Sequence, residues 1–245
     1  MSELIEHPEY NRDTNPYPSF GKKFCGERAI ISLTSWKMRI HTVAKTLYSL
    51  YTMCPGFHIV LVLSEEEFPK MCEELPENLM LFVENEMIEL LWVYRNYRSF
   101  KKVLPTMQKY TNVPIISADD DYEYTVNYAQ MLYDVWSKNK DCVITLDGAS
   151  RQDYYWCRGG ATLYPIGVFS NKEFLDNIKN TKNQNDDAYM AALMRFYKIR
   201  IISLTNFRFN VFKFMNVHDE INALCKQYKY DEIGDINYFY NKLKK

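Results

Sequence analysis

The front half of the chain alternates short apolar runs with stretches of helical spacing. Apolar residues three and four apart predict a helix over 38–53, which the sequence CPG at 54–56 ends. Unbroken apolar and β-branched runs predict buried strands at 28–33, 57–64, 88–94 and 113–118. Strands that alternate with helices indicate an α/β fold with a mostly parallel, Rossmann-like sheet and helices on both faces.

Two shorter helices are predicted between these strands. Ser64 and Glu67 have the spacing of a capping box, which predicts an acidic helix that begins at Ser64. The stretch 99–110 predicts a short helix that is kinked or begins near Pro105.

The pattern is looser after residue 125. A helix is predicted over 125–139, a strand over 141–148 and a further helix that begins in the stretch 185–197. No internal repeat or low-complexity segment divides the chain, so we predict one domain over residues 27–245. Residues 1–26 are polar, carry prolines and lack periodicity, which predicts a loosely ordered arm that the core does not need.

Composition excludes several classes of protein. With 47% hydrophobic residues the chain can bury a full core, and a net charge of −1 gives no general attraction to nucleic acid. Six scattered cysteines without a CxxC pair argue against a zinc module or a disulfide scaffold and favour a reducing compartment. No apolar run approaches the roughly 18 residues of a membrane span, and the polar N-terminus is unlike a signal peptide. We expect a soluble cytoplasmic protein.

Three consecutive acids, Asp119, Asp120 and Asp121, follow the strand predicted at 113–118. Ligands of open parallel sheets bind beyond the carboxyl ends of the strands. In an extended backbone Asp119 and Asp121 point to one side and Asp120 to the other. Two carboxylates on one side suit a hard divalent cation, whose charge offsets their repulsion. The alternative is a cap for the helix predicted near residue 125, although one cap does not require three acids.

Five strings in a fixed order extend this picture: ISLTSWKMRI, RSFKKVLP, ISADDDYEY, GGATLYP and NDDAYM. Over residues 28–220 they resemble bacterial glycosyltransferases of the GT-A fold, of the family-2 type that assembles surface polysaccharides. The resemblance implies a GT-A-like sheet, a nucleotide-diphosphate sugar as donor and Mn²⁺ or Mg²⁺ as cofactor. It also implies a glycan or lipid-linked acceptor, no nucleic-acid partner, and a cytoplasmic location that leaves peripheral contact with the inner face of the membrane open.

The resemblance implies roles for individual residues. Asp121 is implied as a direct metal ligand, Asp119 as a ligand of the metal or the ribose, and Asp120 as a contact of the sugar or ribose. His218 is implied as a third metal ligand, with a surface histidine at a helix start as the alternative. The implied contacts of the nucleotide sugar also include Thr34, Ser35, Arg39, Lys102, Gly159, Gly160 and Tyr164.

Each of these contacts has a plain structural alternative. Arg39 and Lys102 would otherwise be solvated helix residues, and Lys101 competes with Lys102 as the point charge that meets the nucleotide. The glycines at 159–160 let the backbone approach a ligand closely, but they also suit an ordinary turn. Tyr164 has the core as its alternative, because aromatic residues make up 16% of the chain.

Two acids, Asp186 and Asp187, begin the helix predicted in 185–197. Either would cap that helix and interact favourably with its N-terminal dipole, and one acid is enough for a cap. The resemblance implies that Asp187 is the general base that takes the acceptor proton, that Asp186 is the cap, and that the reaction inverts the anomeric carbon. The helix N-terminus is expected to favour the ionised form of Asp187.

The predicted function is therefore metal-dependent transfer of a sugar from a nucleotide-diphosphate sugar. Two alternatives stay open: a metal-dependent phosphatase or nucleotidyltransferase with the same acids, and a non-catalytic carbohydrate-binding protein. A haloacid-dehalogenase-type phosphatase has its acids after an early strand with Thr or Val soon after, whereas Tyr122 and Glu123 follow the fourth strand here. The presence of three acids argues against a protein whose site has decayed.

Overall fold

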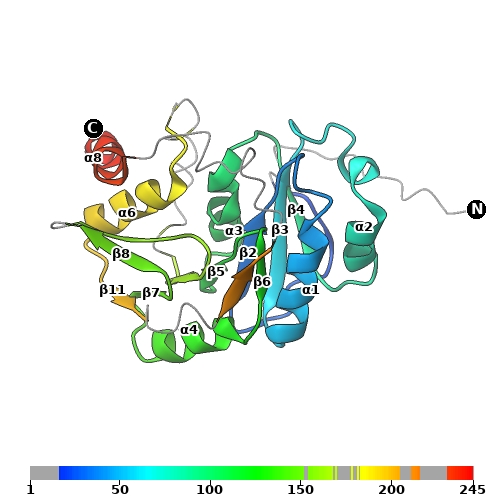
Figure 1. Ribbon diagram of the computed structural model, residues 1–245, viewed down its shortest axis with the longest axis horizontal. Helices are drawn as coiled ribbons and strands as arrows, with labels where there is room; N and C mark the ends of the chain where they lie inside the picture. Colours follow the sequence, from blue (N-terminus) through cyan, green and yellow to red (C-terminus); the bar gives the residue numbers. More distant parts are fainter. Residues whose placement is uncertain are drawn as a thin grey trace, which may run out of the picture.

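The computed structural model describes residues 17–151, 154–167, 169, 178, 181, 183–204, 211–215 and 231–244. Within this part of the chain, eight strands form one central sheet in the order β1-β4-β3-β2-β5-β10-β7-β11 (Figure 1). The bounds in sheet order are Ser19–Gly21, Glu89–Val93, His58–Ser64, Ile30–Thr34, Ile115–Ser117, Thr162–Tyr164, Val143–Thr145 and Ile201–Ser203.

The sheet is mostly parallel, as the sequence predicts. Strand β2 pairs in parallel with β3 and β5, β3 with β4, and β7 with β11. Strand β1 lies antiparallel on β4, and β10 lies antiparallel between β5 and β7. The antiparallel strands were not predicted, because β1 lies in the polar segment assigned to the arm and β10 follows directly on the glycines at 159–160.

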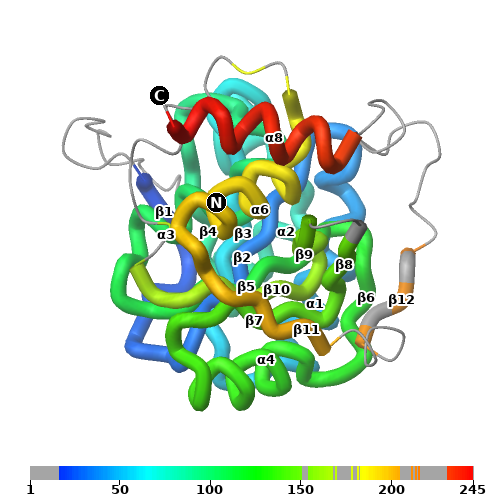
Figure 2. The backbone as a smooth tube through the Cα atoms, turned by 90° about the vertical axis from the view of Figure 1, so that its left-hand side faces the viewer, coloured from blue at the N-terminus to red at the C-terminus, as the bar shows by residue number. Residues whose placement is uncertain are grey.

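Helices cover both faces of the sheet, which confirms the predicted α/β class. Alternate residues of a strand point to opposite faces, so Ile31 joins one core cluster and Ile30 the other. One face carries α1 (Val43–Met53), α2 (Glu77–Glu84) and α4 (Tyr128–Ser137). The other carries α3 (Leu104–Lys109), α6 (Asp186–Phe196) and α8 (Glu232–Leu243), and Figure 2 shows α8 lying along α6.

Two small antiparallel sheets and two short 3₁₀ helices complete the described architecture. Their bounds are Tyr122–Tyr124 (β6) with Phe212–Phe214 (β12), Gly148–Arg151 (β8) with Tyr154–Cys157 (β9), Met71–Glu74 (η1) and Arg98–Lys102 (η2). In the part of the chain that the structure describes, no helix is both long and apolar enough to cross a bilayer.

The acidic helix predicted to begin at Ser64 is wrong. Ser64 Oγ does donate a hydrogen bond to Glu67 Oε2 at 3.0 Å, but the backbone there forms a turn. Pro69 explains the difference, since it lacks an amide hydrogen and disfavours helical geometry at the residue before it. The α-helix of this segment, α2, begins only at Glu77, after Pro76.

The boundary of the N-terminal arm also needs correction. Strand β1 lies inside the predicted arm, and the amide of Trp92 donates to the carbonyl of Pro18 at 2.9 Å. The Tyr17 hydroxyl hydrogen-bonds Gln108, and the ring of Phe24 packs against that of His58. Residues 17–26 are therefore part of the fold, and the rest of the arm, residues 1–16, lies outside the described residues.

A chain that starts at residue 24 is therefore expected to be less stable than one that starts at residue 17. The shorter chain loses β1, which leaves the edge of β4 unpaired and uncovers the apolar surface under Phe20. We expect a loss of about 2 kcal/mol, or roughly 4–8 °C in Tm for a chain of this size. Equal Tm values for the two truncations would show that the arm is dispensable after all.

Candidate active site

The candidate site lies where the strand order reverses. From β2 the chain builds outward through β3 to β4, and it then returns to the other side of β2 with β5. Ligands of open α/β sheets bind outside the carboxyl ends of the strands at such a reversal. Ser35 follows β2, Asp119–Asp121 follow β5, and Ser35 Oγ donates to Asp120 Oδ2 at 2.6 Å. The two segments therefore meet at the point where the fold favours a ligand.

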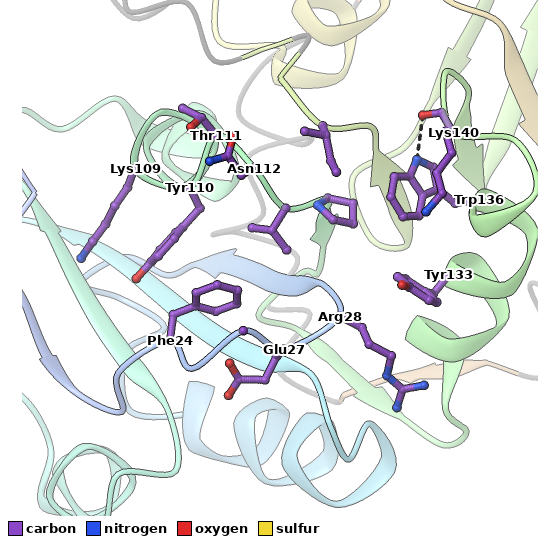
Figure 3. Close-up of a pocket in the computed structure, with 14 residues that line it drawn as sticks. Phe24, Glu27, Arg28, Lys109, Tyr110, Thr111, Asn112, Tyr133, Trp136 and Lys140 are labelled. Carbon is purple, nitrogen blue, oxygen red and sulfur yellow. Dashed lines mark hydrogen bonds between the residues drawn. The ribbon is translucent and has the colours of Figure 1, made fainter.

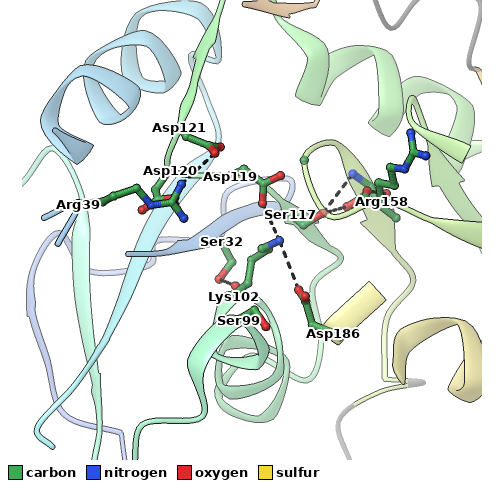
Figure 4. A network of polar contacts seen from close by, with 12 residues as sticks. Ser32, Arg39, Ser99, Lys102, Ser117, Asp119, Asp120, Asp121, Arg158 and Asp186 are labelled. Atoms are coloured by element: carbon green, nitrogen blue, oxygen red, sulfur yellow. Dashed lines mark hydrogen bonds and ion pairs between the residues drawn. The ribbon is translucent and has the colours of Figure 1, made fainter. Parts of the chain in front are cut away.

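The three aspartates divide between two cations (Figure 4). Asp120 and Asp121 both pair with Arg39, at 3.0 and 2.8 Å, whereas Asp119 pairs with Lys102 at 2.6 Å. The strict alternation expected of an extended backbone is not observed, because the chain turns at Asp120 and Asp121. Arg39 is thus part of the site and not a solvated helix residue.

Asp120 is buried and Arg39 is half-buried, and each changes the other's electrostatics. Burial acts to lower the pKa of Arg39, but the three aspartates outweigh it and raise that pKa. Burial raises the pKa of Asp120 to about 6, although Arg39 and the Ser35 hydroxyl act to lower it. The turn is therefore a crowded set of charges whose members compensate one another.

Lys102 bridges the aspartate turn and the start of α6. Its Nζ lies 2.6 Å from Asp119 Oδ1 and 3.3 Å from Asp186 Oδ2. Ser32 on β2 fixes the lysine backbone by donating to its carbonyl at 2.6 Å. Burial acts to lower the pKa of Lys102, but Asp119, Asp186 and Asp187 raise it well above its ordinary value. The ammonium group is therefore held charged between three carboxylates.

Lys101, the competing lysine, has a structural role. Its side chain is 1% exposed, pairs with Glu67 and donates to Asn96 Oδ1 at 3.0 Å. Of the two lysines, it is therefore Lys102 that lies beside Asp119 and Asp186, and its contact with a nucleotide stays a prediction.

Helix α6 begins with a cap that differs from the prediction. Asn185 caps it, accepting a hydrogen bond from the Ala188 amide at 3.0 Å, so the prediction that Asp186 is the cap is wrong. Asp186 is instead free to pair with Lys102. Asn185 also donates to Asp235 of α8 at 3.0 Å, which anchors the start of α6 against its neighbour.

Asp187 differs from the expectation in its charge state. Burial raises its pKa well above the ordinary value, and Asp186 adds to the rise while Lys102 opposes it. The helix N-terminus was expected to favour the ionised carboxylate. Desolvation and a neighbouring like charge outweigh that effect, so Asp187 has the environment of a proton acceptor with raised basicity.

The two predicted glycines allow this close packing. A Cβ at Gly159 would collide with Lys102 Nζ and lie 3.2 Å from Asp187 Oδ1. A Cβ at Gly160 would lie 2.5 Å from the ring of Tyr122 and 2.9 Å from Asp119 Oδ2. Both glycines therefore leave room for the charged side chains of the site.

Gly159→Ala is expected to weaken binding of a phosphate-bearing ligand about tenfold, or about 1.4 kcal/mol, with little loss of stability. The new methyl group meets the end of a flexible lysine, which can move away from Asp119 and Asp186 at small cost. Gly160→Ala is the comparison, because its methyl group meets a buried ring and should lower Tm as well. Calorimetry measures the binding and thermal unfolding measures Tm. Unchanged ligand binding by Gly159→Ala would show that binding does not depend on the position of Lys102 between Asp119 and Asp186.

Two of the predicted residues have roles within the fold, and a third is not among the described residues. Thr34 donates its hydroxyl to the carbonyl of Val62 at 2.7 Å, so this donor is used within the sheet. Tyr164 is 2% exposed and packs edge-on against Phe169, which corresponds to its core alternative and leaves no ring face for a sugar. His218 lies outside the described residues.

Two residues of the site, Asp147 and Tyr124, were not predicted from the sequence. Asp147 follows β7, with its side chain 2% exposed and its Oδ1 3.6 Å from Arg158 Nη1. Its signal was present, because the sequence TLDG puts an acid near the carboxyl end of the strand predicted over 141–148. Tyr124 joins two loops of the site: its hydroxyl accepts from the Asp119 amide and donates to the Gly160 carbonyl, at 3.0 and 2.8 Å.

The aspartate turn suits a metal ion that is shared with a ligand. Among the described residues, no group of three or more His, Cys, Asp or Glu side chains is arranged to hold a metal. Asp119 and Asp121 offer hard carboxylate oxygens, with side chains 24% and 11% exposed. Mg²⁺-like cations often take one or two carboxylates together with water and substrate phosphates. The residues present fit such a site but not a cage made by the protein alone.

Comparison with known proteins shows which fold this architecture resembles. No protein-family model matches the chain, and neither does any curated protein. Among solved structures, the chain is similar to the mannosyltransferase PcManGT from Pyrobaculum calidifontis in complex with GDP-Man and Mn²⁺, with a TM-score of 0.50. The chain has a GT-A-like fold. Identity is 10%, and the match covers 77% of this chain and 58% of the mannosyltransferase, so the likeness extends to the fold alone.

Proposed function

We propose that this GT-A-like protein is a metal-dependent hexosyltransferase that moves a sugar from a nucleotide-diphosphate sugar to a glycan or lipid-linked acceptor. The observation that carries the proposal is the Lys102 bridge, which joins Asp119 after β5 to Asp186 at the start of α6. The GDP-Man and Mn²⁺ in the similar mannosyltransferase structure support the same donor class and cofactor here. The bacterial surface-polysaccharide setting is supported by the sequence resemblance alone.

The donor diphosphate would bind to the two cationic side chains of the site, Arg39 and Lys102. Arg39 and Lys102 now pair with the aspartates, and both are hydrogen-bond donors that suit phosphate oxygens. Asp119 and Asp121 would hold Mn²⁺ or Mg²⁺. When bound, the cation would stabilise the charge that develops on the departing diphosphate.

The acceptor would bind beside Asp187. A general base works best when its pKa lies near the operating pH, and burial raises the pKa of this carboxylate in that direction. The acceptor hydroxyl would give its proton to this carboxylate. Direct attack by that hydroxyl, on the side opposite the diphosphate, would invert the anomeric carbon.

Asp121→Ala is expected to weaken metal-dependent binding of GDP and UDP about a hundredfold or more, equivalent to about 2.7 kcal/mol. Thermal stability should hold, because Arg39 keeps its pair with Asp120 at 3.0 Å. Calorimetry with Mn²⁺, and again with EDTA, measures the effect. The matched control is Glu123→Ala, which removes an exposed acid of β6 two residues away. Parent-like affinity in Asp121→Ala would show that the turn does not hold the metal.

A further inference from the structure

A cavity of about 470 Å³ lies at the amino ends of the parallel strands, opposite the ends that carry the candidate active site. Its lining includes residues that precede β2, β5 and β7, such as Glu27, Arg28, Pro114 and Lys140 (Figure 3). The candidate active site follows the other ends of these strands. Pro114 and Asp119 are five positions apart in the sequence, so the two sites are roughly 16 Å apart along β5 at about 3.3 Å per residue.

Two cations on one side of this cavity have no carboxylate partner among the described residues. The Arg28 guanidinium lies 5.1 Å from the ring centroid of Phe57 and donates to Gln130 Oε1 at 2.6 Å. The Lys140 ammonium lies 3.8 Å from the ring centroid of Trp136. The described residues give neither side chain an ion pair, so each is held by aromatic contact and stays available to an anion.

The other two charged residues of the lining, Lys109 and Glu27, each pair with a residue outside it. Lys109 pairs with Glu89 at 2.8 Å, and Glu27 pairs with Lys22 at 2.9 Å. The uncompensated charge of the cavity is therefore the positive charge of Arg28 and Lys140, which favours an anionic ligand.

The rest of the lining suits a ring with hydroxyl groups. Half-buried Phe24 and Tyr110 offer apolar walls, while Thr111 and Asn112 are exposed polar residues. The two rings are tilted at 55° to each other, and Lys140 covers the face of Trp136, so a flat base finds no parallel pair of rings. A volume of about 470 Å³ lies within the range of small-ligand sites.

We propose that this cavity is a second, non-catalytic binding site for an anionic sugar unit, a hexose phosphate or a hexuronate. Arg28 and Lys140 would pair with the phosphate or carboxylate, and the walls would contact the sugar ring. The site is separate from the donor site, so the proposal does not depend on the proposed glycosyl transfer.

Titration of the whole protein followed by NMR tests this proposal. The reporter is the indole N–H of Trp136, which donates to the Lys140 carbonyl at 3.0 Å and is assigned with Trp136→Phe. Glucuronate and glucose 6-phosphate, in EDTA to keep metal from the other site, are expected to shift this resonance saturably. Neutral glucose should leave it unchanged. A uronate-containing oligosaccharide separates the two sources: tighter binding than glucuronate indicates a glycan, and equal or weaker binding indicates a free sugar acid or phosphate.

Arg28→Gln and Lys140→Gln are each expected to weaken anionic-sugar binding about tenfold, equivalent to about 1.4 kcal/mol. Lys138→Gln is the matched control, an exposed lysine two residues from Lys140 that does not line the cavity. All three variants should bind GDP with Mn²⁺ as tightly as the parent does. A loss of anionic-sugar binding at the cavity can therefore be distinguished from a loss of GDP binding at the donor site. The proposal is overturned if no anionic sugar binds, if the two variants bind it normally, or if inorganic phosphate binds as tightly as the sugar phosphate.

Discussion

Asp187→Asn is expected to cut turnover by about a hundredfold or more while making the folded protein more stable at neutral pH. General bases typically contribute a factor of about 10²–10⁴ to the rate. Burial and Asp186 raise the pKa of Asp187 above its ordinary value of 3.8, so the ionised carboxylate destabilises the fold. This cost grows as pH rises from the ordinary pKa towards the raised one. Asparagine removes the cost together with the base.

The measurements are turnover, donor affinity, and Tm as a function of pH in EDTA. Donor affinity should change little, and the gain in Tm over the parent should disappear below about pH 4, where the ordinary carboxyl is protonated in both states. Asp186→Asn is the control: it breaks the pair with Lys102 and should lower the pKa of Asp187. Normal turnover in Asp187→Asn, or a retained anomeric configuration of the product by NMR, would remove the base role.

Glu89→Gln is expected to cost about 3 kcal/mol of stability at neutral pH. This acid of β4 is 1% exposed and accepts hydrogen bonds from His58 Nε2, Lys109 Nζ and the Tyr110 hydroxyl, at 2.6, 2.8 and 2.6 Å. Burial acts to raise its pKa, but these three partners lower it from 4.5 to about 2. At 1.36 kcal/mol per pKa unit the shift is worth about 3 kcal/mol, in line with about 3–5 kcal/mol for breaking a buried pair.

The pH dependence distinguishes this account from a simple packing defect. A lowered pKa gives stability that is complete above 4.5 and is lost as pH falls towards 2. The difference in unfolding free energy between parent and Glu89→Gln should therefore shrink over that range, as measured by denaturant unfolding. Glu84→Gln, at an exposed acid on α2, should behave like the parent throughout. A difference that is the same at pH 7 and pH 3 would contradict the electrostatic explanation.

The buried parallel strands could be predicted from the sequence because each is an unbroken apolar run. Strands β3, β4 and β5 fall within their predicted ranges, and β2 extends one residue beyond its range, to Thr34. The short strands could not, since their pairing depends on distant residues: β10 inserts between β5 and β7, and Tyr122 of β6 pairs with Phe214 of β12. The local pattern of apolar residues does not reveal such distant partners.

The site was predictable as a set of residue types but not as a set of contacts. The aspartate turn and Lys102 could be found because they flank a predicted strand. That Lys102 would reach Asp186, far along the chain, depends on how α6 packs. The raised pKa of Asp187 depends on desolvation, which no local pattern records. Asn185 was not predicted as the cap of α6, because the two acids that follow it were both considered as caps.

Release of nucleoside diphosphate from a panel of UDP- and GDP-sugars, followed by ³¹P NMR with and without Mn²⁺, tests the central claim most directly. We expect at least one sugar nucleotide to yield its nucleoside diphosphate only when the metal is present. Asp121→Ala should show no release, and Asp187→Asn should be slower by about a hundredfold or more. Inorganic phosphate as the product would indicate a phosphatase, and pyrophosphate a nucleotidyltransferase. Either product, or no binding of any sugar nucleotide in the presence of Mn²⁺, would contradict the proposed glycosyl transfer.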